Sequence, residues 1–140
     1  MASLAQKLGL KPGQSICLLE ATPETEQVIR TACDEDVGGE VTITESLNSV
    51  PFDMIFYWPR ELDGLAERFS ALQRQIVLDG AIWVVIPKKA VARQRGLTLT
   101  WEEMQAAALT TDLVDNKNAS MTDEEYGTRF VIRKLRRRQE

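Results

Sequence analysis

The sequence predicts a single α/β domain, a three-layer sandwich in which helices cover both faces of a mostly parallel sheet. Apolar runs typical of buried strands alternate along the chain with amphipathic segments typical of helices. Strands that are separated by helices need crossover connections, which make them parallel. The last two expected strands have no helix between them, so they should be antiparallel. The length of 140 residues and a hydrophobic fraction of 44% suit one globular core.

The first half of the chain is expected to hold two helices and three strands. Ser3 is placed to cap a short helix that Gly9 ends, and Thr22 with Pro23 has the pattern of a second helix start. The stretch 34–39 should end that second helix. The expected strands cover residues 15–20, 41–44 and 52–57.

In the second half, Pro59 is expected to open an amphipathic helix that extends to Ile76. A fully apolar strand, 81–86, follows and Pro87 closes it. After a polar loop, Thr100 and Glu103 form a T-x-x-E capping box that starts a helix ending near Thr111. The closing strands should begin at Leu113 and cover 128–133, with Gly127 in the turn between them.

Composition excludes several kinds of chemistry. The chain has no histidine, which excludes Ser-His-Asp and Cys-His nucleophiles and every His-ligated metal site. Cys17 and Cys33 are too far apart for a CxxC motif, so we expect reduced core residues, no metal and no cofactor. No apolar run reaches the roughly 20 residues that span a bilayer. We therefore expect a cytoplasmic protein with no membrane partner.

Charge divides the chain into a domain, 1–133, and a basic tail, 134–140. The formal net charge is −4, yet residues 133–140 sum to +4, so residues 1–132 carry −8. An acidic body repels nucleic acid, which leaves Arg136, Arg137 and Arg138 as the only electrostatic footprint for RNA. A short basic tail that is simply solvated is the alternative.

Several segments resemble the core of class I S-adenosylmethionine methyltransferases. The segment Leu10–Ile16 is similar to that family's turn into its first strand, Phe52–Ile55 to its fourth strand, and Leu78–Val85 to its fifth. The antiparallel ending is similar too. The resemblance implies a Rossmann-like fold with one helix-strand unit missing, in the strand order 2-1-3-4-6-5.

A closer resemblance is to the bacterial family called domain of unknown function 3052. It rests on the Leu-Lys-Pro-Gly turn at 10–13, on Pro87-Lys88-Lys89, on 113–117 and on Thr128-Arg129-Phe130-Val131. This resemblance implies a fold and no assigned activity.

The cofactor turn of the methyltransferases is absent. Residues 20–24 stand in its place, with no glycine between Gly13 and Gly38, so side chains and a proline would crowd the ligand. Glu45 falls near the family's ribose-binding carboxylate, but only six residues separate it from Phe52. The helix-strand-helix of the adenine wall has no room there. We expect no useful affinity for S-adenosylmethionine.

Ligands of open α/β sheets bind beyond the carboxyl ends of the strands, which points to 20–22, Trp58, Lys88 and Lys89. Thr22 and its neighbouring carboxylates are explained by helix capping. Lys88 and Lys89 are either a solvated strand exit or an anion-binding pair. Alternation should point the two lysines to opposite sides unless Pro87 already ends the strand.

Asp115 and Lys117 should share one strand face, as a structural ion pair or as a binding patch. The segment 123–126 that follows is explained by turn chemistry. Trp58, Trp83 and Trp101 are expected in the core rather than in a stacking platform.

The leading functional hypothesis is a non-catalytic binding or interaction domain, because the cofactor glycines and the histidines are missing. The first alternative is an enzyme that acts on an anionic metabolite with Lys88 or Lys89 and Asp115. The second is a nucleic-acid-associated protein that uses its tail. The expected partner is a small anion or a protein.

Overall fold

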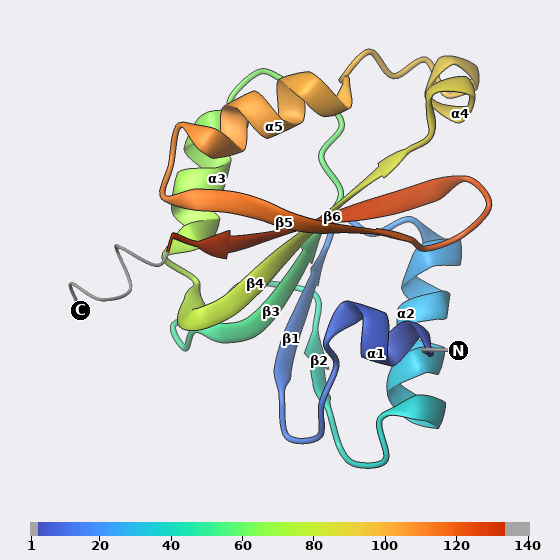
Figure 1. Cartoon of the computed structure of the whole chain (residues 1–140), viewed down its shortest axis with the longest axis vertical. Coiled ribbons are helices and arrows are strands. Elements are labelled where there is room, and N and C mark those ends of the chain that lie inside the picture. Colours follow the sequence, from blue (N-terminus) through green and yellow to red (C-terminus); the bar gives the residue numbers. More distant parts are fainter. Residues whose placement is uncertain (1–2, 134–140) are drawn as a thin grey trace.

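A computed structural model describes residues 3–133, which form a six-stranded sheet with helices on both faces (Figure 1). The helices are α1 (Leu4–Leu8), α2 (Pro23–Asp36), α3 (Leu65–Gln73), α4 (Lys89–Gln94) and α5 (Trp101–Leu109). The strands are β1 (Ser15–Leu19), β2 (Thr42–Thr44), β3 (Phe52–Tyr57), β4 (Ile76–Pro87), β5 (Leu113–Ser120) and β6 (Glu125–Ile132).

The strand order is β2-β1-β3-β4-β6-β5, as predicted. The first four strands in this order are parallel, and β6 is antiparallel to both β4 and β5. Residues 45–51 connect β2 to β3 with no helix, which is the expected loss of one helix-strand unit. The α/β sandwich and its antiparallel closing hairpin are confirmed.

Alternating residues of the strands build one core on each face of the sheet. Leu19, Ile55 and Val84 pack with α3 and α5 on one face, and Leu18, Phe56 and Val85 pack with α1 and α2 on the other. Figure 1 shows these two helix pairs on opposite sides of the sheet. Burial on both faces explains why the central strands are continuous apolar runs.

The capping predictions are confirmed at α1 and α5, and the start of α2 is confirmed by position. Ser3 and Thr100 each form a capping box with the residue three positions later, and Gly9 ends α1 in the left-handed conformation at φ 81°. Pro23 opens α2 with Thr22 at the N-cap position. The chain therefore begins these helices where its local chemistry favours a start.

The helix expected from Pro59 to Ile76 is shorter than predicted. Gly64, at φ 73°, is the N-cap of α3, and Ile76 is already the first residue of β4. Leu62, which the periodicity had placed on the buried side, is 46% exposed. Pro59 is buried after β3 and lies outside α3. The expected polar loop after β4 also contains a short helix, α4.

Gly127 was predicted in a turn but lies within β6, where it pairs with Val85 of β4 and with Ala119 of β5. A Cβ at this position would collide with Met121 and would lie 3.0 Å from the Trp83 ring. The glycine is thus required by packing against a buried indole rather than by turn geometry.

Both cysteines are buried free thiols, as predicted. Trp58 and Trp83 are 3% and 0% exposed, which confirms that they belong to the core, whereas Trp101 is only half-buried. Within residues 3–133, no helix has the length and hydropathy to cross a bilayer.

Candidate functional site

The carboxyl ends of β1, β3 and β4 open into a cavity of about 480 Å³, at the edge of the sheet where open α/β folds bind ligands. We call it the Glu125 cavity. It is lined by Thr22, Pro23, Glu24, Thr25, Trp58, Pro59, Arg60, Val85, Pro87, Arg95, Leu97, Thr122, Glu124 and Glu125. Its volume falls within the range of about 300–1,000 Å³ that is typical of small-molecule sites.

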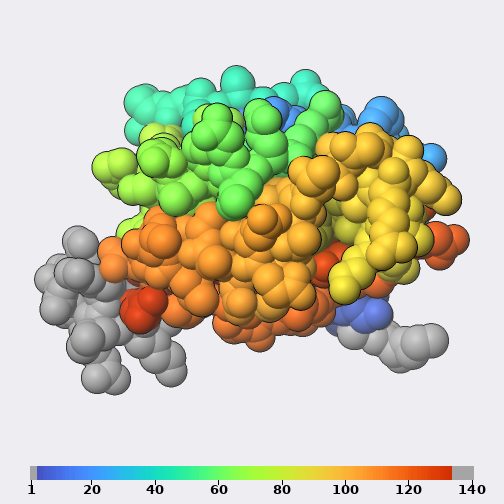
Figure 2. Space-filling model, turned by 90° about the horizontal axis from the view of Figure 1, so that it is seen from above, coloured from blue at the N-terminus to red at the C-terminus, as the bar shows by residue number. Residues whose placement is uncertain are grey.

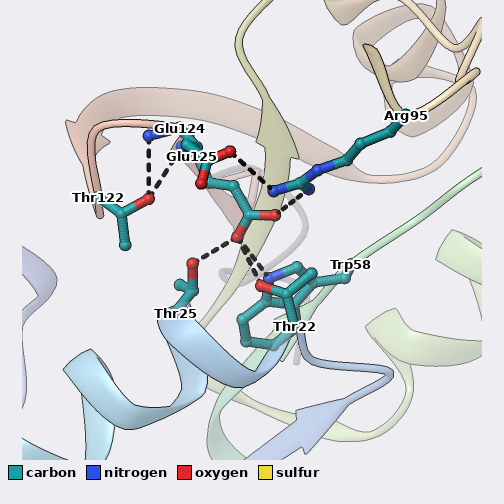
Figure 3. Close-up of polar contacts among 7 residues, drawn as sticks. All are labelled: Thr22, Thr25, Trp58, Arg95, Thr122, Glu124 and Glu125. Atoms are coloured by element: carbon teal, nitrogen blue, oxygen red, sulfur yellow. Dashed lines mark hydrogen bonds and ion pairs between the residues drawn. The ribbon is translucent and has the colours of Figure 1, made fainter. Parts of the chain in front are cut away.

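Glu125 is the first residue of β6, and its carboxylate is buried at 2% exposure beneath this cavity. Oε1 accepts hydrogen bonds from the hydroxyl of Thr22 at 2.7 Å, from the hydroxyl of Thr25 and from the indole Nε1 of Trp58 at 3.3 Å. Oε2 accepts from Nη1 of Arg95 at 2.6 Å. Figure 3 shows the four donors converging on the carboxylate from the start of α2, from Trp58 and from Arg95.

Burial alone would raise the pKa of the Glu125 carboxyl. The hydrogen bonds from Arg95, Thr25 and Thr22, together with the positive charge of Arg95, outweigh burial and hold its pKa below the ordinary value. Glu125 is therefore ionised at neutral pH. Its negative charge is neutralised by Arg95 and stabilised by the hydrogen bonds from Thr22, Thr25 and Trp58, all of which are present without a ligand.

The register of the sheet places Glu125 at this point. Glu125 pairs with Pro87, the last residue of β4, so its side chain sits at the strand ends. The preceding turn is fixed by Thr122, whose hydroxyl accepts hydrogen bonds from the backbone N–H groups of Glu124 and Glu125, each at 3.1 Å (Figure 3). Lys88 N–H donates to the Glu124 carbonyl at 2.9 Å and joins this turn to the exit of β4.

The walls of the Glu125 cavity are mostly apolar. Trp58, Pro59, Val85 and Leu97 supply hydrocarbon and aromatic surface, while charged groups gather toward its rim. Glu24 and Arg60 are exposed there. Glu124 lies 3.7 Å from Nη2 of Arg95, so Arg95 faces two carboxylates.

The family model described as "Protein of unknown function (DUF3052)" matches residues 5–134. The chain belongs to this family. An uncharacterised protein of Mycobacterium tuberculosis and another of Mycobacterium bovis are each 34% identical to it over 107 residues. The match covers 76% of this chain and 65% of the relatives, so the chain spans about two thirds of their length.

Solved structures share the fold at low identity. The N-methyltransferase NodS from Bradyrhizobium japonicum is 10% identical, with a TM-score of 0.58 over 94% of this chain and 92% of that one. The same enzyme in complex with S-adenosyl-L-homocysteine gives a TM-score of 0.60 over 92% and 83% of the two chains. The pyocyanin biosynthetic protein PhzM gives 0.62 at 8% identity, over 86% of this chain and 51% of that one. The scaffold is therefore methyltransferase-like.

The residues after β1 do not fit S-adenosylmethionine. Glu20 occupies the left-handed region at φ 62°, where a glycine would leave bare backbone for a ligand. Its exposed side chain extends toward Arg68, with 3.9 Å between Oε2 and Nη2. Thr22 and Pro23 complete the turn, and the Thr22 hydroxyl is committed to Glu125. Glu45, beside the expected ribose position, is instead 3.7 Å from Arg30.

Two residues named from the sequence line the Glu125 cavity, Trp58 and Thr22. Trp58 was expected both in the core and at the ligand edge of the sheet. Both expectations hold, because its side chain is buried and its indole N–H donates to the Glu125 carboxylate. Thr22 is the N-cap of α2 by position, but its hydroxyl makes no capping hydrogen bond. The capping interpretation of its side chain is wrong, because the hydroxyl donates to Glu125 instead.

Lys88 and Lys89 are exposed and do not line the Glu125 cavity. Pro87 ends β4, Lys88 is the N-cap of α4 and Lys89 is its first residue, so strand alternation does not orient the pair. Lys89 lines a second hollow together with Ala92 and Arg93 of α4. The structure thus separates the two lysines into different surroundings.

Asp115 and Lys117 do not share a strand face. They pair with consecutive residues of β6, Phe130 and Arg129, because the register shifts between them. Consecutive strand residues point to opposite faces, so the expected ion pair is wrong. Their hydrogen bonds run from Gln105 Nε2 to Asp115 at 3.0 Å and from Lys117 Nζ to the Lys7 carbonyl at 2.5 Å.

Lys88 and Asp115 also lie at different levels of the sheet. Lys88 is bonded to Glu124, whereas Asp115 pairs with Phe130, six residues further along the chain. Six extended residues span about 20 Å, more than a lysine side chain can bridge. Lys88 and Asp115 are therefore not brought together as the enzyme alternative would require of this pair.

Glu125, Arg95 and Thr25 were not identified from the sequence. Glu125 lies in an acidic stretch that turn chemistry explained, and Arg95 lies in what was expected to be a polar loop. Arg136, Arg137 and Arg138 lie outside the described residues. Within 3–133, no group of three Cys, Asp or Glu side chains could hold a metal ion.

Proposed function

We propose that this chain is a non-catalytic small-molecule-binding domain built on a methyltransferase-like scaffold, with its ligand in the Glu125 cavity. The observation that carries the proposal is the Glu125 carboxylate, which bonds the start of α2, the segment after β3 and the segment after α4. These contacts hold three walls of the cavity in place before a ligand binds. Preformed, mostly apolar cavities with a few fixed polar groups are typical of small-molecule sites.

The same contacts argue against catalysis. Glu125 has a lowered pKa and its Oε1 already accepts three hydrogen bonds, so it is a weak base with little capacity left for a substrate. Arginine has five N–H donors and no acceptor, so neither Arg60 nor Arg95 can act as a general base. The hydroxyls of Thr22 and Thr25 donate to an ionised carboxylate whose low basicity makes it a poor activator of either oxygen.

The charges around the cavity favour a neutral or cationic ligand over an anionic one. Glu24 and Glu124 face the cavity along with Glu125, whereas Arg95 is shared between Glu124 and Glu125. Arg60 is the remaining cation of the lining, and it is exposed to water. An apolar body bearing an amine would gain both the Trp58 wall and the carboxylates at the rim.

The test is a thermal-shift screen of the whole chain with amines, nucleosides and amides of aromatic amino acids. A ligand at about 100 times its Kd adds roughly 2.7 kcal/mol to the free energy of unfolding. The three tryptophans then locate the ligand by NMR. The indole N–H of Trp58 is bonded to Glu125, and that of Trp83 is bonded to the Leu8 carbonyl deep in the core. Ligands should move the Trp58 resonance and leave that of Trp83 in place.

Glu24→Gln tests the charge preference, and Glu35→Gln is its matched control. Both residues are exposed on α2, but only Glu24 lines the cavity. Cationic hits should bind several-fold more weakly to Glu24→Gln and equally well to Glu35→Gln, since losing one partly exposed charge costs about 1 kcal/mol or less. Hits that leave the Trp58 resonance unchanged, or that the protein converts to a new compound, would refute the proposal.

A further inference from the structure

A second cavity, of about 270 Å³, lies on the opposite side of the segment that follows β4. We call it the α4–α5 cavity. Figure 2 shows the yellow segment of α4 and its connection on the surface beside α5, in orange. Pro87 and Leu97 contribute to both cavities, so a single stretch of chain separates them. The smaller volume, just below the range of typical ligand sites, suits a compound of one or two rings.

Apolar and aromatic groups form the floor of the α4–α5 cavity. Ile86 at the end of β4, Leu99, Trp101 and Tyr126 line it. Trp101 is held in place because its indole N–H donates to the Thr128 hydroxyl at 2.8 Å. Two aromatic rings, of which Trp101 is fixed by its hydrogen bond, beside aliphatic side chains favour a flat, apolar ligand group.

The charged lining of the α4–α5 cavity is entirely positive. Lys89 and Arg93 stand four residues apart on α4, so they share one face of the helix and repel one another. Neither makes an ion pair with any residue of 3–133, whereas Arg95 nearby lies against two carboxylates. Two neighbouring cations with no ion-pair partner among residues 3–133, over an apolar floor, are complementary to an anion.

Tyr126 adds a neutral hydrogen-bond donor. Its phenol makes no hydrogen bond within the described part of the chain, and burial, reinforced by the charge of Glu102, raises its pKa. The hydroxyl therefore keeps its proton at neutral pH and can donate to an acidic group.

We propose that the α4–α5 cavity binds a small amphipathic anion, an aromatic ring system that bears a carboxylate or phosphate. The ring would lie against Trp101 and Tyr126, and the acid group would face Lys89 and Arg93. This site differs from the Glu125 cavity in two ways: its charged lining residues are other ones, Lys89 and Arg93, and it favours an anionic ligand rather than a cationic one.

The experiment titrates the whole chain with indole-3-acetate and with phenyl phosphate, and follows the indole N–H resonance of Trp101. Both anions should move this resonance more than that of Trp58 or Trp83. The neutral isostere indole-3-acetamide should bind at least about tenfold more weakly, because it lacks the charge-assisted bonds. The double variant Lys89→Gln/Arg93→Gln should lose at least about tenfold in affinity for both anions.

Lys88→Gln is the control for position, since it removes one positive charge from the adjacent exposed residue outside the cavity lining. It should bind both anions within about twofold of the wild type. None of the three side chains is buried, so each variant should fold, which its melting temperature verifies. The proposal is overturned if neither anion moves the Trp101 resonance at about 10 mM. Equal binding of the amide, or equal losses in Lys88→Gln and the double variant, would also overturn it.

Discussion

Nη1 of Arg95 lies 2.6 Å from Oε2 of Glu125, which joins the exposed segment after α4 to a carboxylate that is only 2% exposed. The arginine side chain keeps 33% of its own surface in water. One end of this ion pair is thus solvated and the other is buried. The segment 88–99 contains α4, which has no buried residue to hold it against the sheet. The ion pair between Arg95 and Glu125 therefore anchors this segment.

Arg95→Gln should lower the free energy of unfolding by more than a surface substitution usually does. Removing one partner of a buried ion pair costs about 3–5 kcal/mol, and we expect about 2 kcal/mol here because water reaches Arg95. The measurement is the free energy of unfolding in urea. Arg93→Gln, two residues earlier and without an ion pair among residues 3–133, should change it by less than about 0.5 kcal/mol. Equal effects of the two substitutions would contradict this role for Arg95.

Acidification should weaken the protein through Glu125. Its pKa is lowered in the folded state, so fewer protons are bound there than in the unfolded state. The stabilisation is complete above the ordinary pKa of 4.5 and is lost as the pH falls through the lower, folded value. Compared with Glu125→Gln, the wild type should be more stable at pH 7, and this difference should shrink below about pH 4.5. Urea unfolding at several pH values measures it; a difference that stays constant or grows on acidification is inconsistent with a lowered pKa.

Gly127→Ala should destabilise the sheet by about 1–3 kcal/mol through overpacking. The added methyl group would meet Met121 and the Trp83 ring, and Trp83 is 0% exposed and bonded to Leu8. Met121 is buried, so Met121→Ala has a cost of its own. In that background Gly127→Ala should cost less than in the wild type, because one of the two obstacles is gone. Denaturant midpoints of the single and double variants provide the test. A Gly127→Ala variant as stable as the wild type would mean that the ring has room to move.

Strands β1, β3 and β4 were predictable because each contains an unbroken apolar run, 16–19 in β1, 54–57 in β3 and 81–86 in β4. Such runs identify strands buried on both faces. Helix starts were predictable where a cap is local, as at Ser3 and Thr100. The start of α3 was misplaced because proline favours a first turn without requiring one, and Gly64 ends the preceding loop five residues later.

The site was only half predictable for a physical reason. Trp58 and Thr22 follow strands directly, so topology alone places them at the ligand edge. The role of Glu125 depends on the antiparallel register that sets it against Pro87, and Arg95 reaches it from a segment 30 residues away. Asp115 and Lys117 were misjudged because a one-residue register shift is invisible in the local sequence.

The most direct test of the central claim, a binding domain on a methyltransferase-like scaffold that has lost the cofactor site, is calorimetric titration of the whole chain with S-adenosylmethionine. Glu20, Thr22 and Pro23 stand in the turn after β1, where a glycine-rich turn would hold the cofactor. We predict a Kd weaker than about 100 μM, equivalent to less than roughly 5.5 kcal/mol of binding. A Kd below about 100 μM would contradict the account, because the chain would then still bind the cofactor of the methyltransferases.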